Sequence, residues 1–211
     1  MTRKYFVVIS MLAMPYLFGG VAVAQDAAQI ETARKTMEEA GKKFLGLIQG
    51  LTAEQWNFKP ATARHSIGEE AEHIALSEND LQQVIQQVMA SPKNLALAKT
   101  LAGKEKKVRD LMLSANTNPE NFKSPQKLKT LPEVLEYFNR AHGRSLKALV
   151  STPDLSAHVL NHPHPDYRSL TGYQWYFYIA YHNLRHCKQI EEVMADAKFP
   201  GGPRRPVAAA K

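Results

Sequence analysis

Hydrophobic residues recur at helical spacing in four long segments of the chain, and no segment shows the alternation expected of a strand. In each segment the apolar positions fall three or four residues apart, so that they form one stripe along a helix. This pattern predicts helices over about 26–50, 67–90, 131–152 and 172–198. Four long helices with long connections indicate an all-α bundle.

Capping signals mark where these helices begin. A Ser or Thr followed three residues later by Glu or Gln is typical of a capping box. Such pairs precede three of the long helices and one short turn: Ser66 and Glu69, Thr130 and Glu133, Thr171 and Gln174, and Thr52 and Gln55. Between the second and third long helices, 95–112 predicts one or two short helices, and the turn-rich stretch 116–125 predicts a surface loop within a long crossover connection.

The N-terminus has the pattern of a secretory signal peptide. Arg3 and Lys4 precede an apolar run that ends in Ala22-Val23-Ala24. We expect cleavage after Ala24 and a secreted or periplasmic product with no stable membrane span; an uncleaved anchor is the alternative. The predicted organisation is therefore a signal peptide at 1–24, one bundle domain at 25–198 and a disordered tail at 199–211, rich in Pro, Gly and Ala.

Charge and cysteine content narrow the function classes. Removal of residues 1–24 lowers the net charge from +7 to +5, and the basic residues are spread over several segments. Nucleic-acid binders concentrate their charge and interleave aromatic residues, so no nucleic-acid partner is expected. Cys187 is the only cysteine, which excludes an intrachain disulfide.

Histidines supply the candidate chemistry. His182 and His186 lie at i and i+4 on one face of the last helix, a spacing that lets both imidazoles bind one metal ion. The alternative is a pair of hydrogen-bonded core residues. His73 lies on the second long helix and points inward, so adjacent helices would bring it to the pair. Three nitrogen ligands with an open position are typical of a catalytic-type site for zinc, nickel or another divalent ion.

Other polar residues have simpler interpretations. His142 could be a ligand, but a hydrogen-bonded core histidine is the preferred reading. His162 and His164 lie in a proline-stiffened loop that is expected to border the pocket at most. Cys187 points away from His186 and is read as an inert buried thiol. Capping and solvent-facing roles suffice for the acidic residues near His73, which are Glu69, Glu70 and Glu72.

The ordered set of motifs resembles the DinB/YfiT-like superfamily over about 30–194. The matching motifs are LTAEQW through Lys59-Pro60, SIGE with EHI, and the H-xxx-H-xx-QI pattern of the last helix. The resemblance implies a four-helix bundle of up-up-down-down topology, with a divalent metal held by His73, His182 and His186. Related families include thiol S-transferases. Two features depart from the pattern: His65 stands where relatives often have Trp, and export separates the chain from cytoplasmic thiol cosubstrates.

Two function hypotheses follow. The first is a metal-dependent hydrolase or thiol transferase acting on an unknown small-molecule substrate, for which no general base is named. The second is a non-catalytic bundle that binds a metal or a small molecule. The oligomeric state is left open, and a homodimer is one alternative. Turnover that disappears with a chelator and returns with one metal would separate the two hypotheses.

Overall fold

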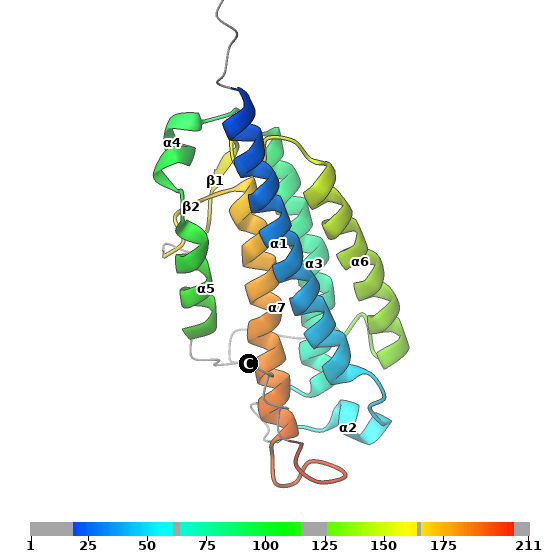
Figure 1. Cartoon of the computed structure of the whole chain (residues 1–211). Helices are drawn as coiled ribbons and strands as arrows, with labels where there is room; N and C mark the ends of the chain where they lie inside the picture. Colours follow the sequence, from blue (N-terminus) through cyan, green and yellow to red (C-terminus); the bar gives the residue numbers. More distant parts are fainter. Residues whose placement is uncertain (1–18, 61–63, 115–125, 164–165, 205–211) are drawn as a thin grey trace, which may run out of the picture.

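The computed structural model describes residues 19–60, 64–114, 126–163 and 166–204, with side chains from residue 27 onward. The chain is predominantly helical (Figure 1). The elements are α1 (Gly19–Ile48), α2 (Ala53–Asn57), α3 (Ile67–Ala90), α4 (Leu95–Thr100), α5 (Lys104–Ser114), α6 (Leu131–Ser151), β1 (Val159–Asn161), β2 (Ser169–Thr171) and α7 (Gly172–Met194). Most of the predicted signal peptide, the predicted loop at 116–125 and His164 lie outside the described residues.

The predicted helices and their caps are confirmed. All four capping boxes form, at the starts of α2, α3, α6 and α7. In each, the hydroxyl of the N-cap accepts a hydrogen bond from a backbone N–H that has no helical partner, and this fixes where the helix begins. The connection between α3 and α6 contains α4 and α5, the short helices expected there.

The directions of the long helices differ from the up-up-down-down order that the family resemblance implied. The ring of Phe44, late in α1, lies 4.6 Å from that of Phe138, early in α6, so these helices are antiparallel. Likewise Glu70 of α3 contacts His186 of α7, whereas the later Glu78 contacts the earlier Asn183, so α3 and α7 are antiparallel. Thus α1 and α7 run one way and α3 and α6 the other (Figure 1). The reason is that only the α3–α6 connection crosses the length of the molecule, whereas an up-up-down-down order needs two such crossings.

Two further segments depart from the sequence predictions. Strands β1 and β2 form an antiparallel hairpin that pairs Val159 with Thr171 and Asn161 with Ser169. Strands of three residues are too short for alternation to reveal them. After the end of α7, Phe199 is buried, and the backbone carbonyl of Pro200 accepts a hydrogen bond from the Gln55 side chain. Residues 199–204 therefore belong to the packed structure, although the sequence predicted a disordered tail from 199.

The core consists of two apolar clusters separated by polar side chains. Residues of α7 up to Ala180 belong to one cluster, and residues from Cys187 onward belong to the other. His182, Asn183 and His186 lie between these two groups along α7. On α3, Glu78 lies between Ala75 of the second cluster and the later residues of the first, and its side chain is fully buried. The candidate ligands thus lie in a polar layer within the helix pack.

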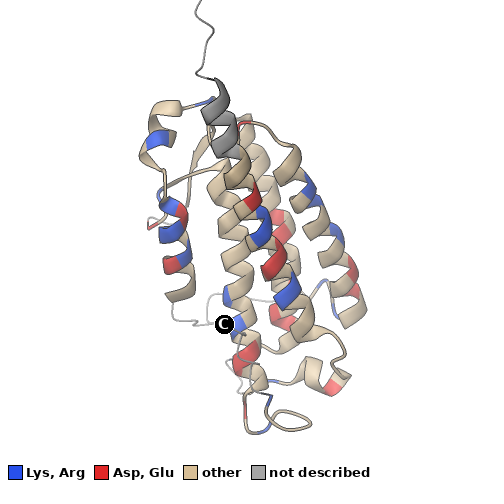
Figure 2. Cartoon of the chain, in the orientation of Figure 1, with Lys and Arg blue, Asp and Glu red and all other residues tan. Residues whose placement is uncertain are grey.

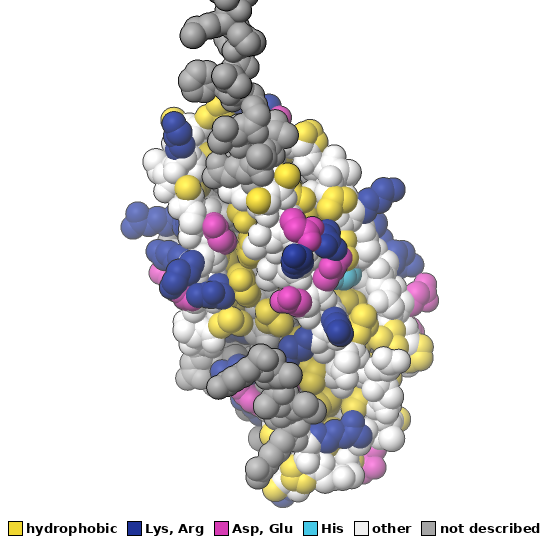
Figure 3. All heavy atoms as spheres, in the orientation of Figure 1, with side chains coloured by type: hydrophobic (Ala, Val, Ile, Leu, Met, Phe, Trp, Pro, Cys, Tyr) yellow, Lys and Arg dark blue, Asp and Glu magenta, His cyan; other side chains and the backbone are white. Residues whose placement is uncertain are grey.

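Charges of both signs are interspersed on the surface. Lys and Arg alternate with Asp and Glu along α1 and α5 (Figure 2). Figure 3 shows acidic and basic side chains close together on the face formed by α1, with hydrophobic atoms between them; there Arg34 forms ion pairs with Glu31 and Glu38. No helix in the described part of the chain has the length and apolarity of a membrane span.

Candidate metal centre

Three histidine side chains from two helices converge in the polar layer. His73 projects from α3, and His182 and His186 project from α7, where their i, i+4 spacing places them on one face. The Nε2 atoms of His73 and His182 are 3.2 Å apart, and the ring of His186 lies 4.3 Å from that of His73. One ligand atom from each residue lies within 4.8 Å of the others. The predicted convergence of these histidines is confirmed.

A buried carboxylate orients one of the three. Oε2 of Glu70 lies 2.8 Å from Nδ1 of His186, and its Oε1 lies 3.0 Å from Nδ1 of His65. Burial alone would raise the pKa of the Glu70 carboxyl, but the hydrogen bonds from His186 and His65 lower this pKa to about 2. An ionised carboxylate only accepts, so Nδ1 of His186 carries the proton and its Nε2 keeps a lone pair. This lone pair is available to a metal.

The other two histidines are held neutral. Burial lowers the pKa of His73 to about 3. Burial also lowers the pKa of His182 well below its usual value. A neutral imidazole has a free nitrogen lone pair, which metal coordination requires. On the side of the His73 ring that faces away from His182, Nδ1 of His73 lies 3.4 Å from the Oγ atom of Ser77.

These shifts predict how the stability of the metal-free protein depends on pH. With a folded-state pKa of about 3 against 6.5 for the ordinary group, the unfolded chain binds more protons through His73 between these values. The free energy of unfolding should therefore fall as the pH falls below 6.5, by up to about 1.4 kcal/mol per pH unit for one such group. Urea denaturation between pH 7.5 and pH 5 would measure this slope. The His73→Gln variant should show a shallower slope, and an equal slope would contradict the assignment.

The remaining candidates lie outside the triad. Nδ1 of His142 forms a hydrogen bond with the side chain of the buried Glu78 at 3.0 Å, as a core histidine would. Cys187 is buried, and burial raises the pKa of its thiol to about 12, which agrees with an inert thiol. The ring of His162 stacks on Trp175 at 4.9 Å and lies 4.8 Å from Tyr178, whose own ring stacks on His182 at 6.4 Å. The His162 side chain is therefore one ring removed from the triad.

Two acidic residues were interpreted wrongly from the sequence. Glu69 caps α3 as expected, but Glu70 and Glu72 are buried rather than solvent-facing. The carboxylate of Glu72 accepts hydrogen bonds from the backbone N–H groups of Gln126 and Leu128, at 3.1 and 2.9 Å. Glu70 lies three residues before His73, and this spacing was the one available signal that it shares the inward face. Glu70 also contacts His65, the residue that departs from the family pattern, so His65 lies at the edge of the site.

The donor set fits a divalent ion. Bonds of about 2.0–2.1 Å from zinc to nitrogen in a tetrahedral arrangement place neighbouring nitrogens about 3.3 Å apart. The 3.2 Å between the Nε2 atoms of His73 and His182 is close to that spacing. A Nδ1–carboxylate contact like that of His186 is also the usual outer support of a metal-bound histidine. All three residues present imidazole nitrogen, a donor that suits zinc, nickel, copper and iron.

The sequence model of the DinB superfamily matches residues 36–190. The chain belongs to the DinB superfamily. The matched range contains all three histidines together with Glu70. No curated protein matches the chain, and no solved structure does.

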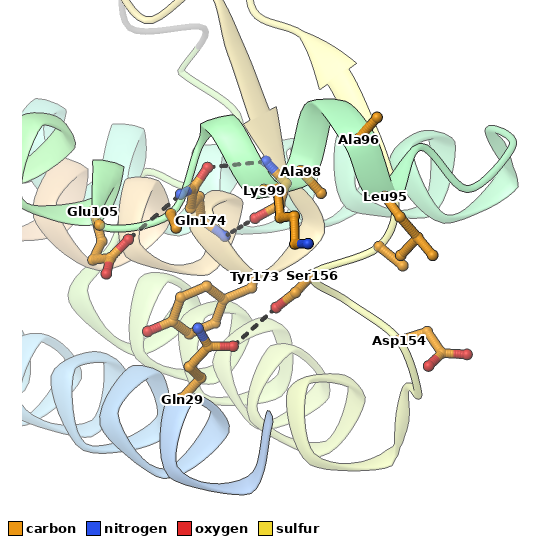
Figure 4. A pocket seen from close by; sticks show the side chains of 14 residues that line it. Gln29, Leu95, Ala96, Ala98, Lys99, Glu105, Asp154, Ser156, Tyr173 and Gln174 are labelled. Carbon is orange, nitrogen blue, oxygen red and sulfur yellow. Dashed lines mark hydrogen bonds between the residues drawn. The ribbon is translucent and has the colours of Figure 1, made fainter. Parts of the chain in front are cut away.

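A separate cavity lies at the N-terminal end of α7. It has a volume of about 710 Å³ and is bordered by α4, the first turn of α7 and neighbouring loops. In Figure 4, Gln29 accepts a hydrogen bond from Ser156, and Gln174 reaches Glu105. None of the three histidines of this DinB protein lines the cavity. The cavity is therefore distinct from the candidate metal centre.

Proposed function

We propose that this DinB-superfamily protein binds one divalent metal ion through His73, His182 and His186, with zinc or nickel as the preferred ion. The observation that carries the proposal is the convergence of three ligand atoms within 4.8 Å. Membership of a superfamily whose members often bind metals supports it. We further propose that α1, α3, α6 and α7 form the four-helix bundle typical of this family.

We propose a metal-dependent hydrolase or transferase reaction at this site. A bound divalent ion lowers the pKa of a coordinated water or thiol and polarises an electrophile. The protein's own residues prepare the site for this chemistry. His73 and His182 are kept neutral by burial. Glu70 fixes the proton of His186 on Nδ1 and adds a negative charge behind that ligand.

A non-catalytic role is the second candidate. The cavity of about 710 Å³ near α4 has the size of a small-molecule pocket but lacks the histidines, so ligand binding there would not require the metal. Assays of hydrolase and thiol-transferase substrates with and without a chelator separate the two candidates. Activity that is lost with the chelator and restored by one metal supports an enzyme.

Metal analysis of the purified protein is the direct test. The protein should be produced without a histidine tag, because a tag adds competing imidazoles. We expect one equivalent of a divalent ion per chain, removable by a chelator and restored by titration with Zn²⁺ or Ni²⁺. Less than a tenth of an equivalent after such titration would contradict the proposal.

We also propose export with cleavage after Ala24, because a basic start, an apolar run and Ala22-Val23-Ala24 follow in order. Mass spectrometry of the protein recovered from the extracytoplasmic fraction should give a chain that begins at Gln25. The Ala22→Arg, Ala24→Arg double variant should accumulate uncleaved, because the processing enzyme requires small residues at these positions. An intact Met1 on a membrane-bound wild-type protein would favour the anchor instead.

A further inference from the structure

Arg185 lies on α7 between two of the candidate metal ligands, His182 and His186. The side chain is partly buried, and its Nε atom is fully shielded from solvent without a hydrogen-bond partner. None of the ion pairs or hydrogen bonds formed within the described ranges involves its guanidinium. By contrast, Arg34 and Arg64 each reach a glutamate. A shielded donor without a partner destabilises the fold, so a partner outside the chain is expected.

Arg185 follows His182 by three residues on α7, so the two side chains project from neighbouring positions of one helix face. Its positive charge contributes to lowering the pKa values of His73 and His182, and it also acts on the phenols of Tyr167 and Tyr178. These residues come from α3, from α7 and from the segment between β1 and β2. Along α7, Arg185 follows Tyr178 by seven residues and therefore lies on nearly the same face.

Aromatic rings form the wall next to this charge. The Tyr178 ring stacks on His182 at 6.4 Å and contacts the Tyr167 ring edge-on at 5.2 Å. The Tyr178 side chain is a phenol, which is protonated at neutral pH and can donate a hydrogen bond. The wall therefore offers one positive charge and neutral donors.

This combination favours a carboxylate. The planar guanidinium fork matches the two oxygens of a carboxylate, and one positive charge balances one negative charge. A phosphate ester carries nearly two negative charges at neutral pH, so one guanidinium neutralises only part of its charge.

We propose that Arg185 binds the carboxylate of a small molecule whose other end reaches the metal held by the three histidines. This rests on the proposed metal site and adds the class of its substrate: a small carboxylic acid that carries a second, metal-binding group. Arg185 positions this molecule, and the wall of Tyr178 and Tyr167 covers its apolar part.

The test uses protein loaded with Co²⁺ and pairs of thiols that differ only in charge. The probes are mercaptoacetate, 3-mercaptopropionate and 4-mercaptobutyrate, each compared with its neutral amide. Binding is followed by the thiolate-to-cobalt absorption band, so that no enzymatic turnover is needed. For the acid of best-fitting length, the wild-type protein should bind the acid about 10- to 100-fold more tightly than the amide, as expected for a charge-assisted pair.

The Arg185→Gln variant should retain one equivalent of cobalt but lose this preference, and Arg185→Lys should restore part of it. Lys188→Gln removes the same charge from an exposed position on the same helix and should leave the preference unchanged. An Arg185→Gln protein that binds cobalt and keeps the full preference would overturn the inference while the metal site stands. Tighter binding of inorganic phosphate than of any of the acids, dependent on Arg185, would overturn the choice of carboxylate. A wild-type protein that binds no cobalt would overturn both proposals.

Discussion

Replacement of His73 by alanine is expected to lower the affinity for the divalent ion by a factor of about 100 or more. A structural zinc site with four ligands contributes about 10–16 kcal/mol, or about 3 kcal/mol per ligand, and 1.4 kcal/mol corresponds to a tenfold change. His73 is the one ligand that α3 supplies, so its loss leaves only the pair on α7. Isothermal titration calorimetry with Zn²⁺ and with Ni²⁺ measures the change. His182→Ala and His186→Ala should behave alike.

Two other histidines provide controls for this experiment. His162→Ala should leave the metal content unchanged, because this side chain stacks on Trp175 and lies outside the triad. His142→Ala should also keep the metal, but it leaves the fully buried carboxylate of Glu78 without one of its partners. The expected loss in the free energy of unfolding is about 2–3 kcal/mol. Full stoichiometry and affinity in His73→Ala would show that the triad is not the binding site.

Replacement of Glu70 by glutamine is expected to lower the metal affinity by a factor of about 10–100, although Glu70 is not itself a proposed ligand. Its carboxylate accepts hydrogen bonds from Nδ1 of both His186 and His65. A glutamine has a single carbonyl oxygen and no charge, so it cannot hold both rings in this way. His186 then loses its fixed proton position and part of its basicity. Competition against a chromogenic chelator measures the affinity.

Glu72→Gln is the matched control for this change. Glu72 lies on the same helix and is equally buried, but its carboxylate accepts from the backbone N–H groups that precede α6. This variant should lose stability and keep its metal affinity. Equal losses of affinity in the two variants would indicate that a buried negative charge anywhere in α3 suffices. The orienting role of Glu70 would then be excluded.

The sequence by itself determined the helices and the identity of the three histidines. Capping boxes act within four residues, and apolar stripes within a few turns, so Ser66, Thr130 and Thr171 could be recognised as helix starts from local pattern alone. The spacing of His182 and His186 is likewise a local property of one helix. The third histidine was found because an inward position on another helix, and the family pattern, both pointed to it.

Only the tertiary structure decided which groups support the histidines and how the helices run. Glu70 and Glu72 differ by two positions in one helix, yet one carboxylate meets imidazoles of His186 and His65 while the other meets the backbone before α6. All of these partners lie outside α3, most of them more than 50 residues away along the chain, and they leave no trace in the periodicity of α3. Helix direction depends on which connection crosses the molecule, and residue patterns within a helix are the same in either direction. The shielded Nε atom of Arg185, which has no hydrogen-bond partner among the described residues, is also a tertiary result, because charge compensation depends on every element packed around a side chain.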